Sequence, residues 1–485
     1  MVDRIEPFAD SFDRRHFLRG AALLGTAVAL GGCTSGGSKA ASTTRSTPTT
    51  RPGGTTSSPT TAASARIRRP GDRPDPSKPE GEDTLPQIEH IVVLMMENHS
   101  YDNYFGVLGR GDGLPLGPSG KPKVALADGS GQYVHSFRMP TTCQVKGLPS
   151  QSWPASHHAL GRGDNSGFVE ACGPVAMGYF TPQDIPFYAG VARTYTLCDR
   201  WFGSCLAQTY PNRRFLMAGT AAGIIDTTAA SVVAPPPPNG VIMERLEAHK
   251  ISWTDYYHDL PATFLFPKFM TTRGDHIAHI DRFYADAAAG TLPAVSFVDP
   301  AFDDPAGMSE ENPSDIRVGE QFAAQVVHAV TTGKAWDKTL LIWLYDEHGG
   351  YYDHVVPPQA IKPDDIAPKL PAGFTKAGYD QYGFRVPAVI ISPYSRPDYV
   401  SHVVHDHTSV MKLIETKWNL PALTFRDANA DNLFDALDFA NPPAFAEPPK
   451  LPPPALGLNG PLPPAACGGA GPGTIPPAGA RTATP

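Results

Sequence analysis

Four apolar runs in the middle of the chain have the length of buried β-strands. They are "IEHIVVLM" (88–95), "LPAVSFVD" (292–299), "TLLIWLYD" (339–346) and "VPAVIIS" (386–392). Continuous apolar runs of this length are typical of strands that are covered on both faces. Between two of these runs, residues 315–332 place Phe322, Val326 and Val330 at the spacing of one helix face.

Strand, helix and strand in this order indicate βαβ units. We therefore predict an α/β fold, with a mostly parallel central sheet and helices on both faces. In such sheets, ligands bind beyond the carboxyl ends of the strands. The polar residues that directly follow each apolar run are thus the first candidates for chemistry.

The composition divides the 485 residues into a body and two ends. Residues 34–85 are almost all Ser, Thr, Pro, Gly, Ala and Arg, which predicts a disordered linker. Residues 446–485 form a Pro/Gly-rich tail, so that the expected domain covers residues 86–445. A net charge of −8 and the lack of a basic aromatic stripe argue against a nucleic-acid partner.

The first 33 residues have the features of an export signal. Arg14 and Arg15 precede the apolar stretch "AALLGTAVALGG", which resembles a twin-arginine signal. The following "LGGC" resembles a lipobox, which would place a lipid on Cys33 and bind the protein to the membrane surface. We expect a protein of the cell envelope, either a lipoprotein on the outer face or a secreted form. The alternative for the two arginines is an ordinary signal peptide.

Export would place the remaining cysteines in an oxidising compartment. Cys198 and Cys205 are close in sequence and could pair, and Cys143 with Cys172 is a second possible pair. The spacing alone does not fix the connectivity.

Two of the apolar runs end on oxygen ligands. Glu97 and Asn98 follow the first run, and Asp346 and Glu347 end and follow the third. Gly349 permits a tight turn that brings the next residues back toward the strand end. Oxygen ligands that converge from two strand ends predict a metal site. The alternative is two solvated loops.

Three further motifs offer polar groups. In "CLAQTYPNRRFLMAG" (205–219), Pro211 fits the first turn of a helix, so that Thr209 lies at the helix N-terminus, where anions bind. Thr209 could instead be a simple helix cap. "SQSWPASHHALGRGDNSGF" (150–168) contains His157. "VSHVVHDHTSVMKLIETKW" (400–418) contains His407, beside Asp406 or other residues that could cap the following helix.

Together these motifs resemble, in their order, the bacterial phosphoesterase family of phospholipases C and related acid phosphatases. That family belongs to the alkaline-phosphatase-like α/β superfamily. The resemblance implies a divalent metal ion of unidentified kind and a phosphate-ester substrate, with phospholipid-type phosphodiesters expected first. By motif, it implies metal ligands at Glu97, Asn98, Asp346 and Glu347, a nucleophile facing the metal at Thr209, a phosphate-binding histidine at His157, and site histidines of less certain role at His354 and His407.

This sequence departs from the family pattern at two positions. Gln151 and Asn312 stand where many relatives have histidine, and an amide carries neither a proton to donate to a leaving group nor a charge. An acid phosphatase that acts on phosphomonoesters is therefore the alternative within the class. A sulfatase is disfavoured, because "CLAQTYPNR" lacks the Cys-x-Pro-x-Arg pattern. A non-catalytic surface lipoprotein is the alternative from another class.

Overall fold

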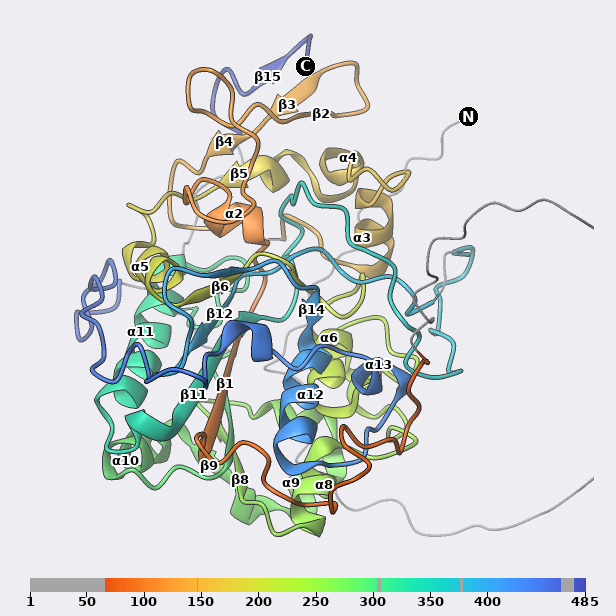
Figure 1. The fold of residues 1–485 in the computed structure, drawn as a ribbon. Coiled ribbons are helices and arrows are strands. Elements are labelled where there is room, and N and C mark those ends of the chain that lie inside the picture. The colour runs from red at the N-terminus through yellow and green to blue at the C-terminus, as the bar shows by residue number, and fades with distance from the viewer. Residues whose placement is uncertain (1–65, 146, 303–306, 376–377, 464–474) are drawn as a thin grey trace, which may run out of the picture. The chain divides into compact units, whose positions relative to one another are not determined.

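A computed structural model describes residues 66–145, 147–302, 307–375, 378–463 and 475–485, and an eight-stranded sheet lies at the centre of the fold (Figure 1). The strand order is β13-β6-β12-β11-β1-β10-β8-β9, and only β12 runs antiparallel to its neighbours in this sheet. The strands are β1 (His90–Met96), β6 (Thr196–Cys198), β8 (Trp253–Tyr257), β9 (Ile277–His279), β10 (Val295–Asp299), β11 (Thr339–Tyr345), β12 (Ala388–Ile391) and β13 (Val400–Ser401). The predicted α/β class with a mostly parallel sheet is confirmed.

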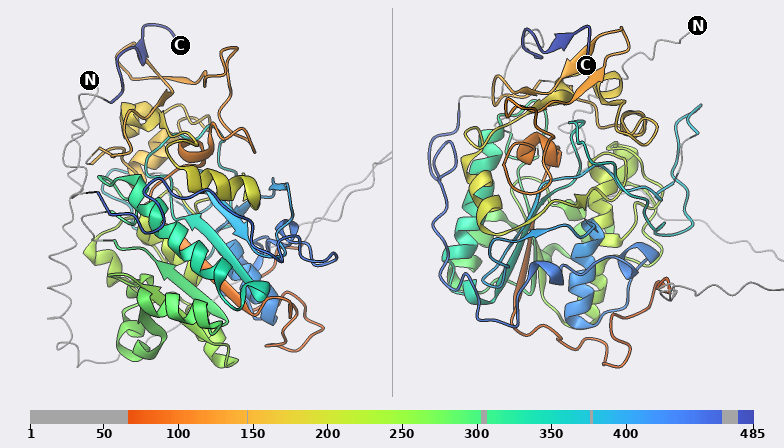
Figure 2. Two further views of the ribbon diagram at one scale, coloured as in Figure 1. Left: turned by 90° about the vertical axis from the view of Figure 1, so that its left-hand side faces the viewer. Right: turned by 45° about the horizontal axis from the view of Figure 1, so that its top comes forward.

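Helices cover both faces of the sheet, which explains the uninterrupted apolar runs. All residues of β11, and Ile91–Met96 of β1, are buried. One face carries α5 (Pro186–Thr194), α10 (Ile280–Ala289) and α11 (Ile316–Thr332), and the other carries α6 (Thr209–Ala218), α8 (Ile242–Ala248) and α12 (His407–Trp418) (Figures 1 and 2). The helix α11 begins after its N-cap Asp315, whose carboxylate accepts from the Arg317 amide, and buries Phe322, Val326 and Val330 as predicted.

Short elements lie above the carboxyl ends of the central strands (Figure 1). They are the helices α2 (Tyr101–Phe105), α3 (Trp153–Ala159) and α4 (Phe168–Cys172), and the strands β2 (Ala125–Ala127), β3 (Tyr133–His135), β4 (Phe137–Arg138), β5 (Gly178–Tyr179) and β15 (Arg481–Thr482). The remaining short elements are α7 (Ala229–Val232), α9 (Pro267–Thr272), α13 (Phe425–Ala428), β7 (Trp201–Phe202) and β14 (His405–Asp406). The candidate site lies between the short elements above the strand ends and the carboxyl edge of the sheet.

Packing extends beyond the range expected for the body. Within the expected linker, the amides of Gly81 and Thr84 donate to the carbonyls of Trp418 and Lys417, at 3.0 and 2.6 Å, where α12 ends. These bonds satisfy carbonyls that a helix C-terminus leaves without an internal partner. In the expected tail, β15 pairs with β3. The predicted export signal and lipobox fall outside the described residues.

The cysteines do not form the two pairs that seemed possible from sequence. Cys172, Cys198 and Cys205 are buried free thiols, whereas Cys143 is disulfide-bonded. Proximity in sequence misled here, because β6 and the turn before α6 hold Cys198 and Cys205 in separate buried surroundings. None of the helices in the described part of the chain has the length and apolar character needed to cross a membrane.

Candidate active site

The carboxyl ends of β1 and β11 meet near the centre of the sheet. The strands are parallel and Met96 pairs with Tyr345, so that Glu97 and Asp346 follow side by side. The backbone amide of Asn98 donates to Asp346 Oδ1 at 3.2 Å, and the backbone amide of Asp346 donates to the Met96 carbonyl at 3.1 Å. The two strand ends therefore converge, as the sequence predicted, and all three polar side chains are buried.

The loop after β11 passes unusually close to the end of β1. Gly349 has φ +63°, and a Cβ atom there would lie 1.9 Å from the Asn98 carbonyl oxygen. Asn98 itself has φ +69°, in the left-handed region that asparagine tolerates better than most residues. Only glycine at position 349 allows this approach, which places Glu347 beside Asp346 and Glu97.

Thr209 reaches the same place from a helix. It is the first residue of α6, after the N-cap Gln208, and its side chain acts on the Asp346 carboxylate, lowering the pKa that burial raises. The turn before it is held by Asn212, whose Nδ2 donates to the Ala207 carbonyl at 2.9 Å and whose Oδ1 accepts from the Cys205 amide at 3.1 Å. Thr209 is therefore not the capping residue, and its hydroxyl lies between the helix N-terminus and a strand end.

Arg213 supplies the positive charge of the cluster. It lies one turn after Thr209 on the same face of α6, and its guanidinium lies 2.9 Å from Asp299, 3.5 Å from Asp346 and 3.9 Å from Glu97. Its Nη2 also donates to the Met95 carbonyl at 3.1 Å. Sequence reasoning missed this residue, although an arginine four positions after a candidate nucleophile on a helix was an available signal.

Negative charge exceeds positive charge in this cluster. Glu97, Asp299, Asp346 and Glu347 are all buried around the single guanidinium of Arg213. Burial raises the pKa of Asp346, although Arg213 offsets part of this effect, and burial together with repulsion from Asp346 raises the pKa of Glu347. Among the described residues, Asp346 Oδ2 and Glu347 Oε1 have no hydrogen-bond partner.

These oxygens fit a bound cation. Buried carboxylate oxygens without donors are costly unless a metal ion or a proton compensates them. Carboxylates, an amide oxygen and a hydroxyl are the donors that hard divalent ions prefer. Glu97, Asn98, Asp346 and Glu347, with Thr209 beside them, are thus groups that could hold a metal ion.

His407 contacts this cluster through the backbone. Its Nε2 donates to the Asp346 carbonyl at 2.6 Å, and its Nδ1 accepts from Trp201 Nε1 at 3.4 Å. Burial lowers the pKa of His407 to about 4, so the ring is neutral at physiological pH. Asp406 is the N-cap of α12, as the simpler interpretation of this motif expected. His407 therefore positions Asp346.

The residues of α3 and of the segment before it lie at the edge of this cluster. The His157 ring packs against the Trp153 ring with centroids 4.3 Å apart and a tilt of 34°, and its Nδ1 lies 2.8 Å from the Trp153 carbonyl. Gln151 is nearer to the cluster, because its Nε2 lies 3.5 Å from Asn98 Oδ1. Asn312 Nδ2 donates to the Leu148 carbonyl at 2.6 Å. Gln151 and the Leu148 carbonyl that Asn312 contacts therefore belong to the same loop before α3.

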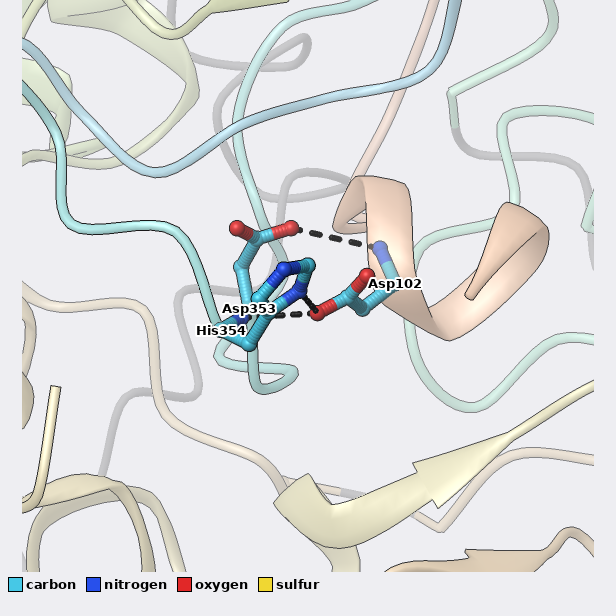
Figure 3. Close-up of side chains that lie close together, drawn as sticks. All are labelled: Asp102, Asp353 and His354. Carbon is cyan, nitrogen blue, oxygen red and sulfur yellow. Dashed lines mark hydrogen bonds and ion pairs between the residues drawn. The ribbon is translucent and has the colours of Figure 1, made fainter. Parts of the chain in front are cut away.

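His354 belongs to a separate polar network (Figure 3). Its Nδ1 lies 2.6 Å from Asp102 Oδ2, and its amide donates to the same oxygen at 2.7 Å. Although Asp102, Asp353 and His354 have the arrangement of a metal site, Arg385 occupies it, since its Nε donates to Asp353 at 2.8 Å and its Nη2 to Asp102 at 3.1 Å. An internal guanidinium already neutralises these carboxylates, and the hydrogen bonds and ion pairs of His354 in the described part of the chain go to Asp102, Asp112 and Arg385 rather than to Asp346.

A buried carboxylate behind the strand ends also escaped the sequence analysis. Glu310 accepts hydrogen bonds from the hydroxyls of three tyrosines, at 2.7, 2.7 and 2.6 Å, which are Tyr104, Tyr188 and Tyr345. Burial raises its pKa to about 8, although these hydrogen bonds act in the opposite direction. Tyr345 directly precedes Asp346, and the neighbouring Ser309 carbonyl accepts from the Glu97 amide at 3.1 Å. Glu310 thus braces both strand ends.

The sequence matches a known protein family and several characterised relatives. A model of the Phosphoesterase family matches residues 88–421. The chain is 31% identical over 424 residues to Phospholipase C B of Mycobacterium tuberculosis, covering 75% of this chain and 80% of that protein. It is 31% identical over 409 residues to the non-hemolytic phospholipase C of Pseudomonas aeruginosa, covering 74% of this chain and 58% of that protein.

Among solved structures, a protein of the alkaline phosphatase superfamily from Vibrio parahaemolyticus aligns with a TM-score of 0.38 and 12% identity, over 74% of this chain and 73% of that one. The family match covers the two strand ends, α6 and the start of α12. The chain therefore belongs to the phosphoesterase family and is a hydrolase of phosphoric esters of the phospholipase C type.

Proposed function

We propose that the protein hydrolyses phospholipid-type phosphodiesters in a metal-dependent reaction, with Thr209 as the nucleophile. The observation behind the proposal is the position of the Thr209 hydroxyl. It lies at the N-terminus of α6, beside the Asp346 carboxylate at the carboxyl edge of the sheet. A helix N-terminus favours anionic phosphoryl oxygens, and an adjacent cationic site favours the ionised hydroxyl.

Glu97, Asn98, Asp346 and Glu347 would hold the divalent ion. When bound, such an ion supplies Lewis-acid stabilisation of phosphoryl charge and lowers the pKa of a nearby hydroxyl. The Arg213 guanidinium lies 3.9 Å from Glu97 and 3.5 Å from Asp346 and attracts both carboxylates. His407 fixes the Asp346 backbone. The protein thus preorganises the carboxylates that would bind the ion.

Two displacements at phosphorus account for the hydrolysis. In the first, Thr209 Oγ1 forms a bond to phosphorus while the bond from phosphorus to the lipid alcohol oxygen breaks. The hydroxyl loses its proton and the leaving alcohol gains one. In the second, water attacks the phospho-threonine, releasing a phosphomonoester and restoring the hydroxyl. The first-turn amides of α6 face developing charge on the phosphoryl oxygens, which is where such donors contribute most.

Neutral amide side chains beside the cluster limit how the leaving group can be protonated. Gln151 approaches the cluster at Asn98, and Asn312 bonds to Leu148 in the segment that leads to Gln151. A neutral amide does not transfer a proton to a leaving group as an imidazolium does. The lipid alcohol must therefore receive its proton from another group or from water. A phospholipid substrate is supported by the names of the relatives, both of which are phospholipases C.

We also propose that the protein acts outside the cytoplasm. The double arginine at Arg14 and Arg15 and the "LGGC" that ends at Cys33 support export by the twin-arginine route and a lipid anchor at the membrane surface. Mass spectrometry of the protein from membranes, compared with a Cys33→Ala variant, tests the anchor. An unmodified Cys33 in the mature protein would contradict it.

Hydrolysis by purified Thr209→Ala protein tests the nucleophile. Phosphatidylcholine vesicles, p-nitrophenyl phosphorylcholine and p-nitrophenyl phosphate serve as substrates, with Thr209→Ser as the matched variant that keeps a hydroxyl. We expect Thr209→Ala to lose at least about 1,000-fold in kcat on both diesters, while Thr209→Ser retains measurable turnover. Diester hydrolysis by Thr209→Ala near the wild-type rate would refute the nucleophile. Preference for p-nitrophenyl phosphate would identify a phosphomonoesterase instead.

A further inference from the structure

A second polar cluster lies away from the candidate active site, beside the edge strand β13. His405 of β14 faces Asp431 and Asp435, and one ring nitrogen and one oxygen of each carboxylate lie within 4.8 Å of one another. The His405 side chain is fully buried, whereas the side chains of Asp435 and Asp431 are 21% and 38% exposed. The cluster is therefore anchored inside and open to solvent on its carboxylate side.

Hydrogen bonds around this cluster fix the tautomer of His405. The Ser401 hydroxyl donates its single proton to Asp435 Oδ2, which can only accept. The contact of 3.2 Å between Ser401 Oγ and His405 Nε2 must then have the ring as its donor. In a neutral ring, the proton on Nε2 leaves a lone pair on Nδ1.

That lone pair points at another acceptor. His405 Nδ1 lies 3.5 Å from Asp431 Oδ1, and neither this nitrogen nor Asp435 Oδ1 has a hydrogen-bond partner among the described residues. Asp431 Oδ1 also accepts from the Leu433 backbone amide at 2.9 Å, but the buried ring nitrogen has no partner, which is costly unless a positive charge lies between it and Asp431. No lysine or arginine of the described residues forms an ion pair with either carboxylate, so the chain supplies no such charge of its own.

The distances favour a cation over a proton at this position. An N–H···O bond normally measures about 2.7–3.2 Å between heavy atoms, and the gap of 3.5 Å is longer. Zinc binds nitrogen and carboxylate oxygen at about 2.0–2.2 Å, and a tetrahedral angle then separates the two ligand atoms by about 3.4 Å. The separation of 3.5 Å between His405 Nδ1 and Asp431 Oδ1 matches that value, while Asp435 Oδ1 lies 3.4 Å from the other ring nitrogen, Nε2.

We propose that His405, Asp431 and Asp435 form a second metal site, which takes a divalent ion of the zinc class, with water completing its coordination. One histidine and two carboxylates are ligands that suit Zn²⁺ and neighbouring transition metals better than Mg²⁺. The Ser401 hydroxyl orients the ring from the other side, in the manner of outer hydrogen bonds at metal sites.

The position of this site gives the ion a structural task. His405 lies in β14, which pairs with β7, and two residues later His407 bonds to the Asp346 carbonyl. Asp406 between them accepts from the Ser204 hydroxyl at 2.8 Å. An ion on His405 ties β14 to the 431–435 loop and so stabilises the segment from which His407 reaches the active site.

Zinc content tests the site. Metal-free full-length protein is incubated with excess ZnCl₂, separated from free zinc by gel filtration, and analysed for zinc per chain. Asp431→Asn removes a partly exposed ligand, and Asp380→Asn is the matched control, because Asp380 is also partly exposed and only ion-pairs with Lys362 at 3.5 Å. We expect Asp431→Asn to bind about one zinc ion fewer than both the wild type and Asp380→Asn. Equal zinc content in all three would overturn the proposal and leave a proton between His405 and Asp431.

A second measurement does not depend on the single variant or on hydrolysis. In a Glu97→Ala background, which weakens the active-site cluster, zinc should still raise the melting temperature. That shift should disappear in the Glu97→Ala/Asp431→Asn double variant and persist in Glu97→Ala/Asp380→Asn. A zinc-induced shift of equal size in both double variants would refute the second site, and so would its absence from Glu97→Ala alone.

Discussion

Replacing Arg213 with methionine removes the one guanidinium among the buried carboxylates of the candidate active site. Methionine keeps much of the side-chain length and leaves Glu97, Asp299 and Asp346 without their shared cation. In metal-free protein, we therefore expect a large loss of stability. With a divalent ion present, we expect the opposite effect on binding, because a competing positive charge beside the ligands has been removed.

The structure allows a magnitude for the loss. At separations of 2.9, 3.5 and 3.9 Å, each pair corresponds to roughly 4–6 kcal/mol of Coulombic attraction at an effective dielectric constant of about 20. Desolvation of the buried charges offsets most of this sum. Removing one partner of a buried ion pair typically costs about 3–5 kcal/mol, which is the expected decrease in the free energy of unfolding.

The neighbouring Arg214 provides the control. It is equally buried, its Nη2 donates to the Pro235 carbonyl at 3.0 Å, and its guanidinium lies over the Phe266 ring at 5.1 Å. Because Arg214→Met leaves no carboxylate unpaired, it should cost about 1–3 kcal/mol. Urea unfolding of EDTA-treated protein measures both losses, and the shift in melting temperature on adding Mn²⁺ should be larger in Arg213→Met than in wild type.

The pH dependence provides a further check. Burial and the neighbouring Asp255 raise the pKa of Asp299, and loss of Arg213 raises it further. Protonation then neutralises the orphaned carboxyl as the pH falls, so the stability deficit of Arg213→Met should shrink toward acidic pH. The reasoning fails if both arginine variants lose the same stability and respond equally to Mn²⁺.

Three other outcomes are expected. In urea unfolding, Gly349→Ala should lower the free energy of unfolding by about 2–4 kcal/mol and Gly373→Ala by only about 1 kcal/mol. Both glycines have a positive φ, but only at Gly349 would a Cβ atom meet a backbone oxygen within 4 Å. Equal losses would contradict the close approach of the backbone at Gly349. With its pKa raised to about 8 by burial, Glu310 holds a proton that the unfolded chain releases near its ordinary pKa of 4.5. The free energy of unfolding should therefore fall as the pH rises from about 4.5 to about 8. Glu310→Gln should reduce the slope of this fall by about 1.4 kcal/mol per pH unit. An unchanged slope would argue against the raised pKa. Dialysis against EDTA should abolish diester hydrolysis and added divalent ions should restore it; full activity after chelation, with no metal by elemental analysis, would refute metal dependence.

The centre of the fold and of the site could be predicted because both follow from local patterns. The apolar runs of β1 and β11 are buried on both faces, and parallel strands end at one edge, so that Glu97 and Asp346 had to meet if the strands were neighbours. The helix start at Thr209 followed from Pro211, which fits the first turn of a helix. None of these inferences needed a contact between residues distant in sequence, apart from the pairing of the two strands.

Other features depend on distant contacts that no local pattern encodes. The direction of β12 was not predictable from "VPAVIIS", because a buried strand has the same composition in either orientation. The pairing of Arg213 with Asp299 joins α6 to β10. Composition also suggested a disordered linker before residue 86, since it measures apolar burial and overlooks hydrogen bonds such as the one from Gly81 to the end of α12. His354 was assigned by motif alone, and it lies in the Arg385 network.

The three buried thiols allow local unfolding of the protein to be measured by chemical modification. Burial raises the pKa of Cys172, Cys198 and Cys205, so that little thiolate is available to react while the structure is closed. They lie in α4, in β6 and in the turn before α6, which are three separate parts of the molecule. The rate at which an alkylating reagent modifies each cysteine under native conditions therefore measures the local opening free energy at three places without any engineered label. In air, unfolded chains would instead exchange these thiols with the Cys143 disulfide, so reversible unfolding requires a thiol-blocking or reducing medium.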